Sequence, residues 1–289
     1  MAKILLLFIT LLFVGVTPTP TSYNELFRLY YTKVQLGTPP RDYYVQIDTG
    51  SNVLWVSCKS CNGCPTSSRL HFYDSSSSST SSLITCSDSL CTQARRYSDS
   101  GCSQSNKQCT FKIQYGDGSE MSGYYVSDLM HLNTMGVDSG SSNSSAKVVF
   151  GCSTSETGSY NETGVNGIFG FSQHSMSVIS RLSSQGVAPD SFSHCLVGSG
   201  NGGGILVFGQ IMDPNMAYTP LVRSGWPLYS VNLQSNSVNG QTLSIDPSTF
   251  SYAGNKIGTV IDSGTTMAYL PLDVLTLLKD AGCQHLYVS

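Results

Sequence analysis

The chain has 289 residues but few charges: Lys, Arg, Asp and Glu make up 11% of it, and the formal net charge is −3. A protein that binds nucleic acid needs a surplus of Lys and Arg to displace counterions from phosphates, so the charge balance argues against that class. Hydrophobic residues make up 40% of the chain, which excludes disorder throughout. The length allows one large domain or two ordinary ones.

The N-terminus has the pattern of a secretory leader. Lys3 is followed by an apolar run from Ile4 to Val16, which is too short for a membrane-spanning helix. A buried N-terminal strand is the alternative. We expect residues 1–22 to be a signal peptide, the mature chain to have no membrane span, and the protein to be secreted to the extracellular space or the cell wall.

In chain order, the next signals are short β-rich runs separated by turns of glycine and proline. Strands are expected at residues 30–34, 43–47, 53–56, 110–115, 123–132, 147–151, 194–197, 205–208 and 229–233. The helix candidates are 175–185, with apolar residues at helical spacing, and about 272–281. Many short strands punctuated by glycine predict an all-β protein.

Seven of the ten cysteines lie within a stretch of 52 residues. The spacing Cys58-x2-Cys61-x2-Cys64 is compatible with part of a zinc site, but no closely spaced pair of histidines accompanies it. In a secreted chain the disulfide interpretation is favoured, and we expect no metal. Two glycosylation sequons, at Asn143 and Asn161, lie in polar stretches that are expected to be surface loops.

One short motif occurs twice. Asp48-Thr-Gly-Ser51 and Asp262-Ser-Gly-Thr265 each follow an apolar run, and they lie far apart in the chain. A repeat at this distance suggests two related lobes that each contribute one aspartate. Two such turns placed face to face would bring two carboxylates so close that both cannot ionise, and the pair would share one proton. One Asp then acts as a base on water while its protonated partner polarises a carbonyl, so amide hydrolysis needs no cofactor.

These motifs resemble those of a known family. The segments that carry the resemblance are Asp48-Thr-Gly-Ser51 with Trp55, Tyr115-Gly-Asp-Gly-Ser119, Asn166-Gly-Ile-Phe-Gly170 and Asp262-Ser-Gly-Thr265. Together they resemble the pepsin-like aspartic proteases, and the cysteine-dense insertion is similar to that of the plant nepenthesin-type subgroup. The resemblance runs from about Leu29 to Leu272.

The resemblance implies a bilobal all-β fold. The N-terminal lobe would cover residues 29–210, with a Cys-rich insertion at 57–110, and residues 211–289 would form an incomplete, truncated C-terminal lobe. Asp48 and Asp262 match the catalytic pair. The positions that match supporting groups are Thr49, Gly50, Ser51, Ser263, Gly264 and Thr265; those that match the flap over the substrate and its support are Tyr115, Gly116 and Trp55.

The resemblance also implies disulfide pairs and an activity. The implied pairs are Cys58 with Cys61, Cys86 with Cys109, Cys91 with Cys102, and Cys64 with Cys152. The implied activity is that of a monomeric aspartic endopeptidase acting on peptides or proteins.

The sequence departs from the family pattern at both ends. The usual prosegment is missing, and the strands expected after Asp262, including a cysteine that would pair with Cys195, do not follow. We therefore expect low or no activity from this chain. The alternative is a non-catalytic secreted binding protein of the same fold, similar to plant inhibitors of glycosidases. Such proteins tend to lose an Asp-x-Gly turn or the flap tyrosine, and this sequence keeps all three.

Overall fold

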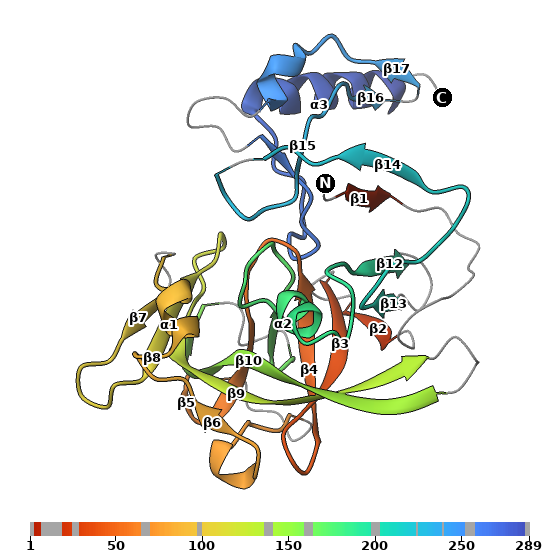
Figure 1. Cartoon of the computed structure of the whole chain (residues 1–289). Coiled ribbons are helices and arrows are strands. Elements are labelled where there is room, and N and C mark those ends of the chain that lie inside the picture. The colour runs from red at the N-terminus through yellow and green to blue at the C-terminus, as the bar shows by residue number, and fades with distance from the viewer. Residues whose placement is uncertain are drawn as a thin grey trace.

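The computed structural model describes residues 3–6, 19–24, 29–64, 70–96, 100–135, 141–158, 164–197, 203–223, 225–238, 240–251 and 258–286. Most of the strand residues belong to one twelve-stranded sheet, and the predominance of strands confirms the all-β fold class (Figure 1). Its strands are β2 (Thr19–Asn24), β3 (Leu29–Leu36), β4 (Arg41–Asp48), β5 (Leu54–Asn62), β6 (Ser82–Leu83), β7 (Ser100–Cys102), β8 (Cys109–Gln114), β9 (Glu120–Met135), β10 (Ser141–Thr157), β11 (Gly167–Gly170), β12 (Ser193–Val197) and β13 (Gly203–Val207).

The strand order places the first aspartate in the middle of the sheet. The strands run β12-β13-β2-β3-β4-β11-β5-β10-β9-β8-β7, and β6 pairs with β9. Strand β4, which ends at Asp48, and strand β5, which leaves its loop, are both central. The sheet therefore fixes the backbone on both sides of that loop.

Both faces of the sheet are covered, because successive side chains of a strand point to opposite faces. On β5, Leu54 and Val56 pack in one apolar cluster, and the intervening Trp55 packs in the other. The short strand β11 divides in the same way, with Phe169 in the first cluster and Ile168 in the second. Continuous apolar runs at these strands follow from burial on both faces.

Two short helices accompany the sheet, α1 (Ser89–Ala94) and α2 (Val178–Ser184), together with the 3-10 turn η1 (Ser75–Ser77). Helix α2 confirms the helix expected within 175–185, although it is shorter. The Ser177 side chain accepts a hydrogen bond from the Ser180 amide and so caps the first turn. The buried side chains of α2 are those of Val178, Ile179 and Leu182.

After residue 210 the described residues form strands of two to four residues, one 3-10 turn and the longest described helix. They are β14 (Ala217–Pro220), β15 (Ser230–Val231), β16 (Ser237–Val238), β17 (Gln241–Thr242), the 3-10 turn η3 (Pro247–Phe250), β18 (Thr259–Val260) and α3 (Leu272–Leu286). The strands make three separate two-stranded sheets, one of them with β1 (Lys3–Leu6). Figure 1 shows most of this segment standing apart from the large sheet. It approaches the sheet where the chain after β18 descends toward β4, and where Pro227 and Tyr229 hydrogen-bond to the chain that follows β11.

The expected leader overlaps two described strands. Strand β1 pairs with β14, and β2 lies between β13 and β3. Cleavage of residues 1–22 stays a prediction. Within the described residues, no helix is both long enough and apolar enough to span a bilayer.

The structure corrects all four disulfide pairings while it keeps the eight cysteines. The bonds are Cys58–Cys152, Cys61–Cys64, Cys86–Cys102 and Cys91–Cys109. Cys58 lies on β5 beside β10, whose Cys152 is in register with Val56, so Cys58 and not Cys64 reaches Cys152. Cys102 and Cys109 lie opposite each other on β7 and β8, and each is bonded to a cysteine on the preceding segment. Cys195 is buried and free.

One sequon was also placed wrongly. Asn143 lies on β10, in register with Asn133 of β9, and not in a loop. Polar residues extend this hairpin because its backbone groups bond to each other whatever the side chains are. The Asn143 side chain is exposed. Asn161 lies outside the described residues.

Candidate active site

The Asp48 loop is built around β11. This strand runs parallel to β4, with Gly170 opposite Asp48, and antiparallel to β5, with Phe169 opposite Leu54. The chain therefore passes between the two arms of the loop. A side chain on Gly170 would meet the backbone of residues 51–53, which explains the glycine at this crossing. The structure thus places residues 168–170, part of a segment that carries the family resemblance, between the two arms of the first aspartate loop.

Asp48 is buried, with 5% of its surface exposed. The Gly50 amide donates to its Oδ1 at 2.8 Å, and the Ser51 hydroxyl donates to its Oδ2. Both carboxylate oxygens are therefore held by the loop itself, and the carboxyl group has one fixed orientation.

The Asp262 loop repeats this arrangement. The Gly264 amide donates to Oδ1 of Asp262 at 2.8 Å, and the Thr265 hydroxyl donates to Oδ2 at 2.6 Å. The repeat seen in the sequence is thus a structural repeat, with a glycine amide and a hydroxyl in equivalent positions.

The two loops hold each other through a symmetric set of hydrogen bonds. The Ser263 amide donates to Thr49 Oγ1 at 2.9 Å, and the Thr49 amide donates to Ser263 Oγ at 3.2 Å. Each hydroxyl then donates to a carbonyl across the junction: Thr49 to Ile261 at 3.2 Å, and Ser263 to Ile47 at 3.1 Å. These four bonds fix the approach of the two aspartate turns.

The two aspartates meet at this junction. A Cβ added to Gly50 would collide with the Asp262 carboxylate, and one added to Gly264 would collide with the Asp48 carboxylate. Each turn therefore approaches the other's carboxylate so closely that only glycine fits. Burial, followed by the nearby Asp262 charge, raises the pKa of Asp48 to about 7.

Tyr115 approaches the site from the turn between β8 and β9. The buried Trp55 donates its Nε1 proton to the Tyr115 hydroxyl at 2.8 Å. Burial and the Asp48 charge raise the pKa of Tyr115, so the phenol stays neutral. Gly118 has a φ of +85°, which the turn requires. Gly116 has open space around it, so packing does not demand a glycine there.

Two residues near the junction were missed by the sequence analysis. The Gln46 side chain donates to the Gly264 carbonyl at 3.5 Å, and the Tyr229 hydroxyl donates to the Phe171 carbonyl at 2.6 Å. Gln46 could have been found as the polar residue inside an apolar strand. Tyr229 had no signal, because its partner is a backbone group at the end of β11.

The support of the two loops is unequal. Strand β11 crosses beneath the Asp48 loop, whereas β18, which leads to Asp262, pairs only with β15 in the described part of the chain. Met267 and Tyr269, just beyond the Asp262 turn, are 69% and 83% exposed. The second loop therefore depends on the first for its position.

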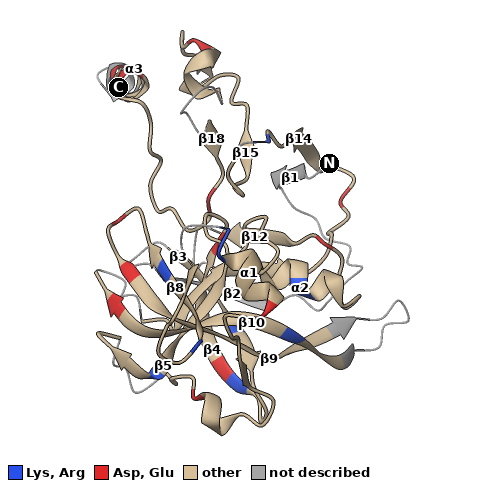
Figure 2. Ribbon diagram, turned by 60° about the vertical axis from the view of Figure 1, so that its left-hand side comes forward, with Lys and Arg blue, Asp and Glu red and all other residues tan. Residues whose placement is uncertain are grey.

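The ligand atoms of Cys61, Cys64 and Glu156 lie within 4.8 Å of one another. The two sulfurs are bonded to each other, so they offer no thiolates, and we assign no metal ligands there. In the part of the chain that the structure describes, Lys and Arg are scattered along the ribbon and do not gather on one element (Figure 2).

Comparisons with known proteins identify the family of the chain. A family profile described as "Xylanase inhibitor N-terminal" matches residues 30–210. Aspartic proteinase 36 of Arabidopsis thaliana is 39% identical over 256 residues, which are 86% of this chain and 52% of that protein. Aspartic proteinase 39 of the same plant is 37% identical over 249 residues, 84% of this chain and 50% of that protein. The chain thus spans about half the length of these relatives.

Solved structures share the fold. The "Crystal structure of edgp" matches with a TM-score of 0.72 at 19% identity, covering 92% of this chain and 68% of that one. The "Crystal structure of Basic 7S globulin from soybean" matches with a TM-score of 0.70 at 20% identity, covering 95% of this chain and 74% of that one.

Proposed function

The chain belongs to the plant family of pepsin-like aspartic proteinases whose N-terminal half the xylanase-inhibitor profile describes, and we propose that it carries a two-aspartate site for peptide-bond hydrolysis. The observation that carries the proposal is the reciprocal approach of Gly50 to the Asp262 carboxylate and of Gly264 to the Asp48 carboxylate. Two carboxyl groups brought together in this way share one proton at acid pH.

The roles of the two aspartates follow from their surroundings. Asp48 is the more buried of the pair and its pKa is raised, so it holds the shared proton. Its hydroxyl hydrogen polarises the carbonyl of the scissile bond and passes to the carbonyl oxygen as water adds. Asp262 accepts a proton from that attacking water, whose oxygen bonds to the carbonyl carbon. Asp262 then gives its proton to the amide nitrogen as the C–N bond breaks, and Asp48 takes a proton back from a hydroxyl of the intermediate, which becomes the new carboxyl group. The amide hydrogen bonds from Gly50 and Gly264 keep the two carboxyl groups oriented for this exchange.

In this proposal, Tyr115 is the flap residue, which lies over the bound peptide. Its hydroxyl is fixed by Trp55 and lies so near to Asp48 that burial and the Asp48 charge together raise its pKa. A bound peptide under the turn would lie between Tyr115 and the aspartates, where bulk water is excluded.

We expect the chain to bind a transition-state mimic of the pepstatin type, and to cleave peptides slowly. Catalysis needs carboxylates held within about 0.5 Å, and the Asp262 loop has support from one side only. The test is a cleavage assay on a denatured protein at pH 3 to 7, together with calorimetric titration of pepstatin, on the chain and on Asp48→Asn. Loss of both signals in Asp48→Asn is expected. A folded chain that neither binds pepstatin nor cleaves would overturn the proposal.

The second candidate is a non-catalytic binder of cell-wall hydrolases. The observation that favours it is the profile match over residues 30–210, whose description names an inhibitor. Inhibition of a xylanase by the chain, unchanged in Asp48→Asn, is the result that would select it.

A further inference from the structure

Apart from the aspartate site, one further feature is unusual: the disulfide between Cys61 and Cys64, which closes a ring of four residues at the end of β5. The partners are three residues apart, against a separation of 94 for Cys58 and Cys152. So short a ring removes little freedom from the unfolded chain, so this bond contributes less to stability than the other three. Both cysteines are partly exposed, and Asn62 and Gly63 between them are exposed. Stability alone does not account for this bond.

A buried carboxyl group lies against this disulfide. Glu156 on β10 is 2% exposed, and its Oε1 lies 3.7 Å from Cys61 Sγ. Its Oε2 has no hydrogen-bond partner among the described residues. The other neighbours of the carboxyl group are the hydroxyls of Ser57 and Ser153, and neither is charged. A buried acid with one unused oxygen beside a sulfur atom has no role in the aspartate site.

Burial of Glu156 favours its protonated form. It raises the pKa of the carboxyl group to about 7, although the hydroxyls of Ser57 and Ser153 act in the opposite direction. The Ser57 hydroxyl lies 2.8 Å from Oε1 of Glu156 and 3.0 Å from the Asn166 carbonyl oxygen. One hydroxyl proton cannot serve both acceptors, so a protonated Glu156 can donate to Ser57 while Ser57 donates to the carbonyl.

The backbone builds the contact between the ring and Glu156. Gly63 has a φ of +78°, and a Cβ there would collide with the Glu156 carbonyl oxygen. Asn62 is in register with Ser155 on β10. The Cys-Asn-Gly-Cys turn is therefore seated directly on the residue that carries the carboxyl group, and only glycine permits that approach.

We propose that the Cys61–Cys64 disulfide is a thiol–disulfide exchange site for dithiols, at which Glu156 carries the proton of Cys61. In the reductive direction, a thiolate of the dithiol attacks Cys64 Sγ, the Cys61–Cys64 bond breaks, and a mixed disulfide forms. Cys61 leaves as a thiolate and takes the proton of Glu156. The second thiolate of the dithiol then displaces Cys64, which takes a proton from water. The dithiol is oxidised to a disulfide, and two electrons reduce the protein disulfide to two thiols.

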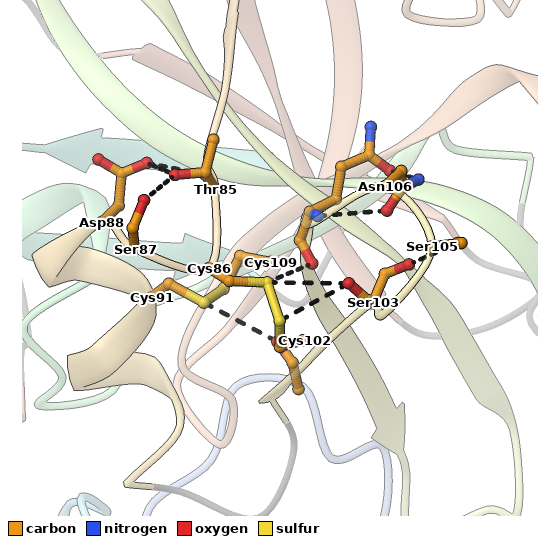
Figure 3. The surroundings of a disulfide bond; sticks show 12 residues. Thr85, Cys86, Ser87, Asp88, Cys91, Cys102, Ser103, Ser105, Asn106 and Cys109 are labelled. Carbon is orange, nitrogen blue, oxygen red and sulfur yellow. Dashed lines mark hydrogen bonds between the residues drawn. A yellow bond between two sulfur atoms is a disulfide. The ribbon is translucent and has the colours of Figure 1, made fainter.

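The chain contains its own control for this proposal. Cys86 and Cys102 form a disulfide that is also partly exposed. The hydrogen-bond acceptors beside its sulfurs are the carbonyl oxygens of Ser103 and Gln108 (Figure 3). The nearby carboxylate of Asp88 instead accepts a hydrogen bond from the Thr85 amide. The two disulfides are thus both partly exposed, and they differ in the buried acid and in the length of the loop that they close, with partners 3 residues apart in one and 16 in the other. The effect of the acid itself is therefore separated by the Glu156 variant below.

The first experiment measures the order in which the disulfides of the full chain are reduced. The native protein is treated with dithiothreitol for increasing times, the freed thiols are alkylated, and the peptides are quantified by mass spectrometry. We expect Cys61 and Cys64 to be labelled at least about tenfold faster than Cys86 and Cys102. Equal rates, or faster labelling of Cys86 and Cys102, would overturn the proposal.

The second experiment tests the proton carrier. At a fixed concentration of dithiothreitol thiolate, Glu156→Gln should reduce the labelling rate of Cys61 about tenfold. The matched control is Glu120→Gln, which changes an acid of the neighbouring strand β9 that pairs with Lys112 at the surface. It should leave the rate unchanged. An unchanged rate in Glu156→Gln would contradict the role of the acid.

If Glu156→Gln does not fold, the role of Glu156 can be tested in the native chain through the pH dependence of its reduction. Its labelling rate at constant dithiothreitol thiolate should fall as the pH rises through about 7, where Glu156 loses its proton. A rate that does not change over this range would remove Glu156 from the step.

Discussion

Asp48 is a carboxyl group that the fold makes hard to ionise. Its pKa rises from 3.8 to about 7, first because of burial and then because of the Asp262 charge. The folded state therefore binds a proton that the unfolded state has released between these values. The stabilisation is complete below pH 3.8 and is lost as the pH rises through about 7.

The pH dependence of stability separates these two causes. Between pH 4 and 7 the free energy of unfolding should fall by roughly 3 kcal/mol more in the native chain than in Asp48→Asn, which has no proton to lose. Asp262→Asn should keep most of the decrease, because burial of Asp48 remains. Urea titrations of the three proteins at several pH values measure the free energy of unfolding. If Asp262→Asn alone flattened the profile, charge and not burial would be the main cause. Glu156 is present in all three proteins, so its contribution cancels.

At the scale of elements, the Asp262 loop is held by the Asp48 loop. Thr49→Val removes the acceptor of the Ser263 amide and the donor to the Ile261 carbonyl, at a cost of about 1–3 kcal/mol. Hydrogen exchange of peptides covering 258–265 should then become about tenfold faster or more, while β4 and β5 stay protected. Thr49→Ser keeps the hydroxyl and serves as the control. Equal exchange rates in Thr49→Val and the native chain would show that the hydrogen bonds between the two loops do not hold the Asp262 loop in place.

The sequence predicts the elements whose pattern is local. Strands β4 and β5 were expected because apolar residues fill them, and α2 because three apolar residues follow helical spacing. The hairpin β9–β10 is longer than expected, because Ser141 to Ala146 carry no strand signal and are ordered by pairing with β9. Hydrogen bonds to a partner strand compensate for weak propensity.

The residues of the two sites also divide into those that the sequence predicts and those that only the structure reveals. Asp48 and Asp262 could be found because one motif occurs twice, and the structure brings their loops together. The disulfide pairing could not, because it depends on the register that sets Cys102 opposite Cys109. Glu156 could not be found either, since only the packing of β5 on β10 buries this one acid in a stretch rich in Ser and Thr.

At the scale of the whole molecule, the burial of apolar side chains is uneven. Both apolar clusters consist of residues up to Phe208. Beyond the sheet, by contrast, Trp226 and Leu272 are 62% and 79% exposed. We propose that residues 29–210 are the cooperative unit, and that the segment after residue 210 is bound to it mainly through the Asp262 loop and Tyr229.

Limited proteolysis tests this division. A protease at low concentration should cut first between residues 211 and 271, because short two-stranded sheets open at little cost in free energy. The remaining core should include residues 29–210 with all four disulfides, and it should melt cooperatively within about 5 °C of the full chain, since the apolar clusters are intact. The melting curve is measured before and after digestion by near-ultraviolet circular dichroism. Early cleavage inside β9 or β10, or a core that loses its cooperative transition, would mean that the C-terminal segment is part of the same folding unit.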